Sequence, residues 1–269
     1  MSTLSNWFES MPSQHHLKCA ETWASSQSCS GLAQLPALSV WISSKAFGAS
    51  DAGGDVHYLS VCPSCIVSRI ALADVSGHGL AVESVGTKLR ELMQKYLAAL
   101  DQANLMSDLN EAVRQELDGI HYATMVAVSF HGRRGLLVMT NAGHPPPLWY
   151  RANRGDWEWL EPQRAEPESR MTGTPLGLLP KVSYPRTIVK PKPGDLIVLY
   201  SDGISEATNS EGKELGPDQL MTLARALNTK TAAAFGVQLV DAINEFRRDR
   251  AAEDDQTLIV LQPFPERSS

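Results

Sequence analysis

The sequence lacks the features of a membrane-spanning, secreted or nucleic-acid-binding protein. No apolar run approaches the roughly 20 residues that span a bilayer, and residues 1–19 contain no basic segment followed by an apolar one. Its 24 Lys and Arg stand against 30 Asp and Glu, a formal net charge of −6, so no general positive field attracts a polyanion. We therefore expect a cytoplasmic protein with neither a membrane nor a nucleic acid as partner.

Cysteine is also scarce. Four cysteines in 269 residues would be a thin disulfide framework, which favours a reducing compartment. Cys62 and Cys65 enclose a Pro-Ser pair, which indicates a turn between strands; a zinc site would need two more ligands at a spacing the chain does not offer. No cysteine is followed six positions later by arginine, which argues against a thiol-based phosphatase.

The chain does contain enough apolar residues, 43%, for one sizeable domain. Residues 1–35 are polar and weakly periodic, so we expect an irregular or partly helical lead-in before a single domain over residues 36–265. Strand-like segments at 38–46, 56–62 and 66–73, with a break at Gly53-Gly54, indicate an antiparallel meander.

Helices and further strands follow in blocks. Helical spacing of apolar residues predicts helices over 82–100, 105–117, 220–227 and 235–246. Strands are predicted at 124–130, 136–141, 148–151, around 188, at 196–200 and at 257–261. Because strands and helices occur in separate blocks and do not alternate strictly, the sequence favours an α+β fold in which helices cover antiparallel sheets.

In four short stretches an aspartate stands at a strand end, beside glycine or another acid. They are Gly53-Gly54-Asp55, Asp74-Val75-Ser76-Gly77-His78-Gly79, Ser201-Asp202-Gly203 and Asp254-Asp255-Gln256-Thr257. Any one of them has the composition of an ordinary turn. If their strands are neighbours, however, the acids gather at one sheet end, where clustered carboxylates require cations such as Mg²⁺ or Mn²⁺.

These stretches, with Asn141-Ala-Gly-His144, Thr174-Pro-Leu-Gly177 and the run from Pro193 to Gly203, resemble the successive motifs of the bacterial PPM-type phosphatases. This is the sporulation and stress-response branch of the protein phosphatase 2C superfamily. The resemblance covers about residues 38–261 in the family's order. It implies a four-layer α/β/β/α sandwich of two antiparallel sheets flanked by helices.

The resemblance also implies a site for two Mn²⁺ or Mg²⁺ ions. Asp74 would bridge both ions, the Val75 carbonyl would bind one, Asp202 and Asp254 would hold the other, and Asp55 would act directly or through water. The residues beside these ligands are expected to support them: Gly54, His144, Gly203 and Asp255. One departure is Val56-His57-Tyr58, where the family usually has an aromatic residue after Gly-Gly-Asp and an acid two positions further on.

The implied reaction is hydrolysis of phosphoserine or phosphothreonine by a metal-bridging water. His78 is a candidate general acid for the leaving alkoxide, with bonding of the glycine turn as the alternative. The implied substrate is a phosphorylated regulatory protein, such as an anti-sigma-antagonist. Two other functions stay open: a non-catalytic phosphoprotein-binding module of the same fold, and a phosphatase for a different phosphate ester.

Overall fold

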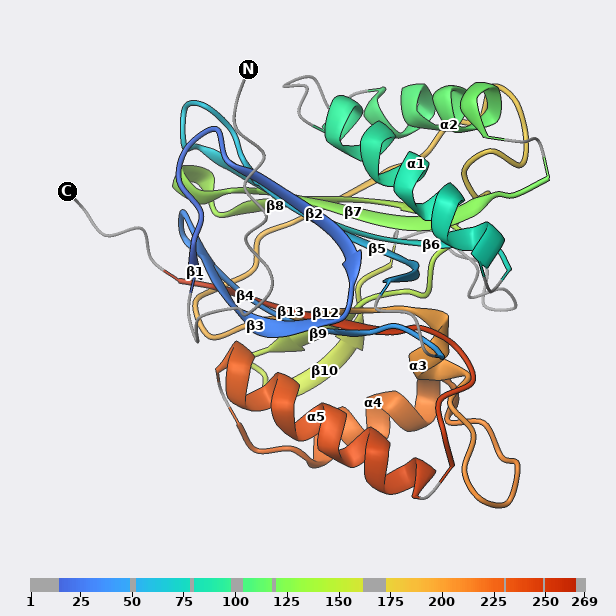
Figure 1. Cartoon of the computed structure of the whole chain (residues 1–269). Helices are drawn as coiled ribbons and strands as arrows, with labels where there is room; N and C mark the ends of the chain where they lie inside the picture. Colours follow the sequence, from blue (N-terminus) through green and yellow to red (C-terminus); the bar gives the residue numbers. More distant parts are fainter. Residues whose placement is uncertain are drawn as a thin grey trace.

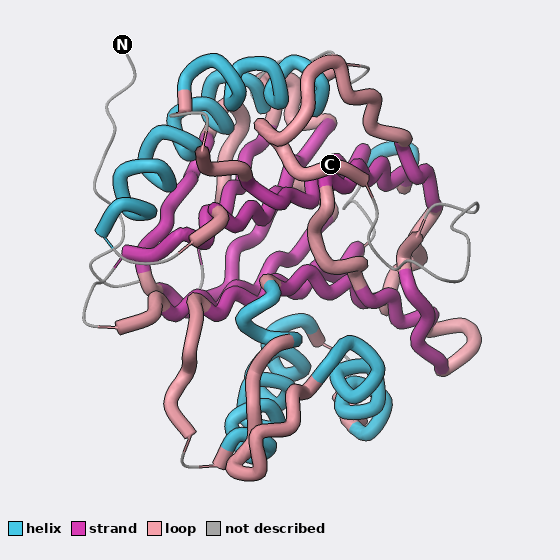
Figure 2. The backbone as a smooth tube through the Cα atoms, turned by 90° about the vertical axis from the view of Figure 1, so that its right-hand side faces the viewer, coloured by secondary structure: helices cyan, strands magenta, loops and turns pink. Residues whose placement is uncertain are grey.

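The protein is a sandwich of two β-sheets with helices on both outer faces (Figure 1). The computed structural model describes residues 15–48, 52–77, 80–97, 104–117, 120–161, 173–229, 231–248 and 250–264. A view turned by 90° shows the same layers, with the strands between two groups of helices (Figure 2). This arrangement confirms the expected α/β/β/α sandwich.

The first sheet, sheet A, has seven strands. Its neighbours are antiparallel except β1 and β3, which pair in parallel over two residues. In spatial order the strands are β1 (His15–His16), β3 (Cys29–Leu35), β4 (Leu38–Lys45), β13 (Gln256–Pro263), β12 (Leu196–Tyr200), β9 (Leu148–Arg151) and β10 (Asp156–Trp159).

The second sheet, sheet B, has six antiparallel strands. In spatial order they are β11 (Arg186–Val189), β8 (Leu136–Ala142), β7 (Ala123–His131), β6 (Val67–Val75), β5 (Ala52–Val61) and β2 (Thr22–Gln27). The described helices are α1 (Leu80–Leu97), α2 (Leu105–Glu116), the short α3 (Asp202–Ser205), α4 (Gly216–Ala226) and α5 (Ala232–Arg247), with a 3₁₀ turn at Gly132–Arg134.

Alternation along the strands divides the apolar side chains among three layers of core. In β4, Val40 and Ile42 point between the sheets, whereas Trp41 packs with the cluster beneath α4 and α5. A third cluster fills the space between sheet B and the helices α1 and α2. The absence of a side chain at Gly236 lets α5 pack very close to the Trp41 ring. A Cβ at this position would lie 2.1 Å from the ring.

The helical predictions are confirmed, and three others are corrected. Within the expected lead-in, residues 22–27 and 29–35 form β2 and β3, one in each sheet, because their few apolar side chains reach the sandwich core. The expected antiparallel pairing is confirmed for β5 and β6 but wrong for β4, which lies in sheet A and not in sheet B. Gly53 and Gly54 do not break a strand but lie inside β5.

The cysteine prediction is also changed by the structure. Cys62 to Cys65 form the expected turn between β5 and β6, closed by the Cys65 N–H donating to the Cys62 carbonyl at 2.9 Å. Cys65, however, forms a disulfide with Cys19, with Cα atoms 5.0 Å apart. Sequence spacing could not identify this pair because 46 residues separate the two cysteines.

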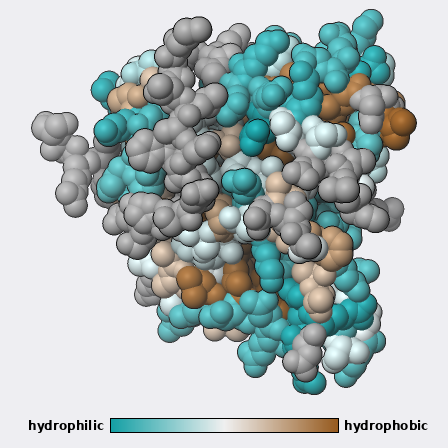
Figure 3. Space-filling view, viewed as in Figure 1, coloured by the Kyte–Doolittle hydropathy of each residue, from teal (hydrophilic) through white to brown (hydrophobic). Residues whose placement is uncertain are grey.

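No helix in the described residues is both long and apolar enough to cross a bilayer. On the face drawn in Figure 3, hydrophobic groups form small separate patches among polar side chains. Scattered apolar groups of this kind are normal for a protein surface.

Candidate metal centre

Strand pairing brings the predicted acids to one end of the sandwich. Asp55 and Asp74 are directly opposite each other in the ladder between β5 and β6, so both side chains point to the same side of sheet B. Asp202 lies two residues after the end of β12, and Asp254 lies two residues before the start of β13. Because β12 and β13 are antiparallel neighbours, these two acids meet at the same edge of sheet A.

Two glycines allow the segment at residues 254–255 to approach closely. A Cβ at Gly53 would lie 2.3 Å from an Asp255 carboxylate oxygen, and a Cβ at Gly203 would lie 2.0 Å from the Asp255 carbonyl oxygen. Real side chains never tolerate such contacts, so any larger residue would push the segment away. The Gly-Gly-Asp and Ser-Asp-Gly motifs therefore require glycine for space and not for a turn.

The Asp255 carboxylate ties the two sheets together. One oxygen accepts a hydrogen bond from the Phe47 N–H at 2.6 Å, and the other accepts from the Gly54 and Asp55 N–H groups of β5. Both oxygens are thus held by backbone donors. Asp255 thereby fixes where β5 lies relative to β13. That Asp255 and Gly54 support metal ligands stays a prediction.

Asp74, Val75, Asp202 and Asp254 line one cleft, with a volume of about 640 Å³. Asp55 lies below this surface and is only 2% exposed. Among the described residues, no lysine or arginine lines the cleft. In the described part of the cleft wall, the acids are therefore not offset by a cationic side chain.

Burial and mutual repulsion both disfavour ionisation of this cluster. Burial raises the pKa of Asp55 to about 8, and the charges of Asp255 and Asp202 add to the shift. The nearby Thr257 and Ser201 hydroxyls oppose the rise in the Asp55 pKa, but their hydrogen bonds are made elsewhere, to Ser44 and to the backbone.

The neighbours of Asp55 behave in the same way. Burial raises the pKa of Asp74 well above its ordinary value, with further increases from the charges of Asp55, Asp202 and Asp254. Burial also raises the pKa of Asp202, while the Gly203 N–H opposes this rise. Carboxylates that are crowded like this ionise together only when cations neutralise them.

The donor set fits divalent cations in its chemistry. Both carboxylate oxygens of Asp55 are buried without a hydrogen-bond partner. Burying a carboxylate in this way costs much free energy unless a cation or a proton neutralises it. All the candidate ligands are oxygens, which Mg²⁺ and Mn²⁺ prefer. In the described part of the chain, however, no three acidic, histidine or cysteine side chains surround a common point as ligands of one ion. The cluster has the composition of a metal site but not, with these rotamers, its coordination geometry.

The two buried histidines have different surroundings. His144 is 1% exposed and its Nδ1 lies 2.9 Å from the Thr124 hydroxyl, while the Asn141 side chain bonds both the N–H and the carbonyl of His144. Burial lowers the pKa of His144 to about 3, so the ring is neutral and serves to fix the loop. His57 is fully buried beside Trp23, and burial lowers its pKa to about 3 as well. His78, the candidate general acid, lies outside the described residues.

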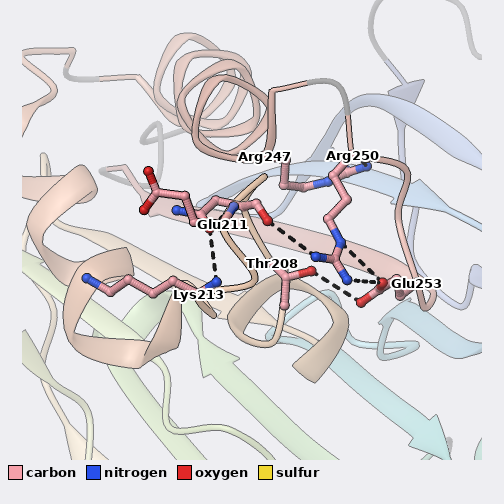
Figure 4. A network of polar contacts seen from close by, with 7 residues as sticks. Thr208, Glu211, Lys213, Arg247, Arg250 and Glu253 are labelled. Carbon is pink, nitrogen blue, oxygen red and sulfur yellow. Dashed lines mark hydrogen bonds and ion pairs between the residues drawn. The ribbon is translucent and has the colours of Figure 1, made fainter.

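A polar network holds the loop that carries Asp254, a feature that sequence reasoning missed. Arg250 donates to Glu253 and to the Asn209 carbonyl, and Thr208 also donates to Glu253 (Figure 4). The network thereby joins the loop before β13 to the loop that follows α3. A basic run such as 247–250 is typical of a helix end, and nothing in the sequence marks the partners of its arginines.

Buried Arg247 extends this support toward Asp202. Its guanidinium donates to the Gln256 side chain at 3.0 Å and to the Arg250 carbonyl at 2.8 Å. Gln256 in turn donates to the Gly203 carbonyl at 2.8 Å. Arg247 therefore connects the segments that carry Asp202 and Asp254.

The two stacked sheets, the flanking helices and the acid-lined cleft together define a PPM-type phosphatase fold. The model of the family described as Stage II sporulation protein E (SpoIIE) matches residues 68–264. The chain belongs to this family. Its resemblance to the sporulation and stress-response branch is thereby confirmed.

Individual relatives agree with this placement. The chain is 26% identical over 195 residues to phosphoserine phosphatase RsbU of Bacillus subtilis, covering 72% of this chain and 55% of that protein. It is 24% identical over 146 residues to phosphoserine phosphatase RsbP of the same organism, covering 52% of this chain and 34% of that protein. The chain thus spans about half or less of the length of these curated relatives.

Solved structures share the fold. The PP2C phosphatase domain of SpoIIE from B. subtilis, solved with a fragment of its regulatory domain, superposes with a TM-score of 0.70 at 18% identity, covering 84% of this chain and 63% of that one. The RsbU and RsbW domains of a Mycobacterium tuberculosis protein give a TM-score of 0.68 at 22% identity, covering 86% of this chain and 62% of that one. At these identities the likeness establishes the fold alone.

Proposed function

We propose that this protein is a metal-dependent phosphatase that hydrolyses phosphoserine or phosphothreonine on a regulatory protein. The observation that carries the proposal is the cleft lined by Asp74, Asp202 and Asp254. Beside it lies the buried carboxylate of Asp55, opposite Asp74 in the strand ladder and without a hydrogen-bond partner. Membership of the SpoIIE family and the similarity to two phosphoserine phosphatases support it.

In this proposal the acids hold two Mn²⁺ or Mg²⁺ ions. The residues that would hold them are Asp55, Asp74, Asp202, Asp254 and the Val75 carbonyl. Bound ions would neutralise phosphate charge and lower the pKa of a coordinated water. The chain's own contribution is to position these oxygens, through the Asp255 contacts with β5 and the Arg247 contacts with Gln256.

A protein substrate is supported by an apolar rim beside the cleft. Ile120, Tyr122, Leu178 and Leu179 are 80%, 39%, 49% and 53% exposed, and two of them, Tyr122 and Leu178, also line the cleft. The two segments run side by side because Ala123 and Leu176 form an antiparallel bridge. Apolar groups around a polar site are typical of a protein-binding surface.

The side chain of Asn110 on α2 holds this rim in place. Fully buried Asn110 accepts from the Gly177 N–H at 2.9 Å and donates to the Leu179 carbonyl at 3.0 Å. Ser107, also on α2, donates to the Val182 carbonyl at 3.0 Å. A surface held this firmly loses little conformational entropy on binding, which favours recognition of a folded partner.

The proposed partner is a phosphorylated regulator of the anti-sigma-antagonist kind. This choice rests on the relatives, one of them a phosphoserine phosphatase named RsbU and another a structure that joins an RsbU domain to an RsbW domain. The cleft itself selects only for a phosphate ester that can reach the acids.

The test measures turnover of an aryl phosphate and of a phosphoserine peptide with Mn²⁺, with Mg²⁺ and with chelator. We expect turnover of both substrates with a metal, none in chelator, and none for Asp74→Asn. Phosphopeptide binding without turnover at saturating Mn²⁺ would instead identify a non-catalytic binding module. Turnover of the aryl phosphate alone would point to a different natural phosphate ester.

A further inference from the structure

Three cysteines meet at the end of sheet B that lies away from the acids. The turn at 62–65 joins β5 to β6, and its closing hydrogen bond runs from the Cys65 N–H to the Cys62 carbonyl at 2.9 Å. The first and last Cα atoms of such a turn lie within about 7 Å, close to the range a disulfide spans. Cys65 is bonded to Cys19, so a third cysteine stands beside an existing disulfide.

The Cys19 segment is packed against the same strand end by its backbone. The Ala20 N–H donates to the Val61 carbonyl at 3.1 Å, and the Val61 N–H donates to the Glu21 carbonyl at 3.0 Å. These bonds keep Cys19 near the turn whether or not its sulfur is bonded. The disulfide therefore adds a covalent tie to a contact that already exists.

The Cys62 sulfur is surrounded by hydrogen-bond donors. It accepts from the Ile66 N–H at 3.3 Å and the Val67 N–H at 3.2 Å, and it lies 3.1 Å from the Ser64 hydroxyl. Burial acts to raise the pKa of Cys62, but these donors outweigh it and the pKa is lowered. Donors of this kind stabilise the thiolate, which is the nucleophilic form.

Cys29 provides the contrast within the same chain. It is the other free cysteine, and burial raises its pKa to about 12. Its sulfur lies 3.5 Å from His57 Nε2, inside the sandwich. Cys29 therefore has the surroundings of an inert structural thiol, and Cys62 those of a reactive one.

We propose that Cys62 is a reactive thiolate that exchanges with the Cys19–Cys65 disulfide. The Cys62 sulfur attacks the Cys65 sulfur, a Cys62–Cys65 bond forms, the Cys65–Cys19 bond breaks, and Cys19 leaves as a thiolate. One disulfide replaces another, so no oxidant or reductant is consumed. The Cys62 sulfur lies against the N–H of Ile66, the residue directly after Cys65, so the two cysteines are near neighbours in the turn.

The exchange would switch a covalent tie without touching the acid cleft. In the Cys19–Cys65 form, the segment between β1 and β2 is bonded to sheet B; in the Cys62–Cys65 form it is held by backbone hydrogen bonds alone. The ladder from Asp55 opposite Asp74 to Val61 opposite Ser68 contains seven residue pairs and is about 20 Å long. The proposal therefore stands or falls independently of the proposed phosphatase activity.

The test follows disulfide isomers in the whole chain. Folded protein oxidised with diamide is freed of reagent, held at pH 8, quenched with acid, labelled with N-ethylmaleimide and digested with trypsin. Lys18, Lys45 and Arg69 are cleavage sites, so Cys62 and Cys65 share the peptide 46–69 while Cys19 lies in the peptide 19–45. The Cys19–Cys65 isomer thus appears as a cross-linked pair of these two peptides. The Cys62–Cys65 isomer appears as two separate peptides.

We expect wild type to show both isomers, with Cys19 labelled in at least about a tenth of the molecules. The Cys62–Cys65 isomer should form more slowly at pH 5 than at pH 8. Cys62→Ser should give only the cross-linked pair, and the matched control Cys29→Ser should behave as wild type. Iodoacetamide should modify Cys62 in reduced protein at least about tenfold faster than Cys29.

Wild-type protein that keeps Cys19 unlabelled for hours at pH 8 would overturn the proposal. So would failure of folded protein to form the Cys19–Cys65 bond under diamide. The pH comparison needs no variant, so it decides the matter even if Cys62→Ser does not fold.

Discussion

Asp55→Asn should make the metal-free protein more stable, although it removes a buried charged residue. The pKa of Asp55 is raised from its ordinary 3.8 to about 8, mainly by burial. Between these pH values the folded state keeps a proton that the unfolded state releases. The free energy of unfolding therefore falls as pH rises through this window, by about 1.4 kcal/mol per pH unit for this one group.

The size of the effect follows from the same shift. At pH 7 the unfavourable contribution of Asp55 is roughly 4 kcal/mol, because pH 7 lies about three units above the unfolded pKa. Asparagine cannot ionise, and its buried amide carries a desolvation cost similar to that of the protonated acid it replaces. We expect the free energy of unfolding of Asp55→Asn in chelator to exceed that of wild type by about 2–4 kcal/mol at pH 7 and by almost nothing near pH 4.

The assay is urea unfolding in chelator at pH 5, 6, 7 and 8, repeated with Mn²⁺. Asp195→Asn is the matched control, because Asp195 is also fully buried but accepts hydrogen bonds from Trp149, Ala152 and Lys192. The free energy of unfolding of Asp195→Asn should be lower than that of wild type by about 1–3 kcal/mol at every pH, since an amide nitrogen cannot accept these hydrogen bonds. Mn²⁺ should stabilise wild type more than Asp55→Asn, because binding to the folded state raises its stability.

One result would refute this reasoning. If Asp55→Asn in chelator unfolds at the wild-type urea concentration and shows the wild-type pH slope, the acids are not strained by burial and repulsion. The case for a cation-requiring cluster would then fall, whatever the activity measurements show.

Three further predictions concern activity. Asp74→Asn and Asp202→Asn should each abolish aryl phosphate turnover at saturating Mn²⁺ while urea midpoints in chelator stay equal or rise; wild-type turnover in both would remove them from the site. Arg247→Met should raise the Mn²⁺ concentration for half-maximal turnover several-fold, whereas the control Arg225→Met, at an exposed residue, should not. The same Mn²⁺ concentration for both variants would show that Arg247 does not position the acids. Leu178→Ser should raise KM for the phosphoprotein several-fold more than KM for the aryl phosphate, and equal changes would exclude the apolar rim from recognition.

Local sequence patterns were enough to identify most of the helices and strands and the chemical type of the candidate site. Helical spacing identified α1, α2, α4 and α5, because one buried stripe repeats every turn whatever the helix packs against. The order of the short motifs identified the family and with it the set of acids. These features are local, so they can be read without knowing which segments become neighbours.

The pairing of these elements was known only from the three-dimensional structure. The sequence marks both β4 and β5 as strands but not which sheet each strand joins, so two strands close in the chain were wrongly expected to pair. The glycines at 53 and 203 have the composition of turns, yet their role is to admit Asp255 from the far end of the chain.

The same limit applies to the contacts that support and surround the acids. Arg247 and Gln256, and likewise Cys19 and Cys65, acquire their roles from partners that no local pattern specifies. The rise in the pKa of Asp55 also depends on burial and on the charges of Asp255 and Asp202, which come from other strands. Sequence motifs supply the acids of the candidate site, whereas packing of the two sheets sets their distances, burial and charge, because those quantities exist only between segments that folding brings together.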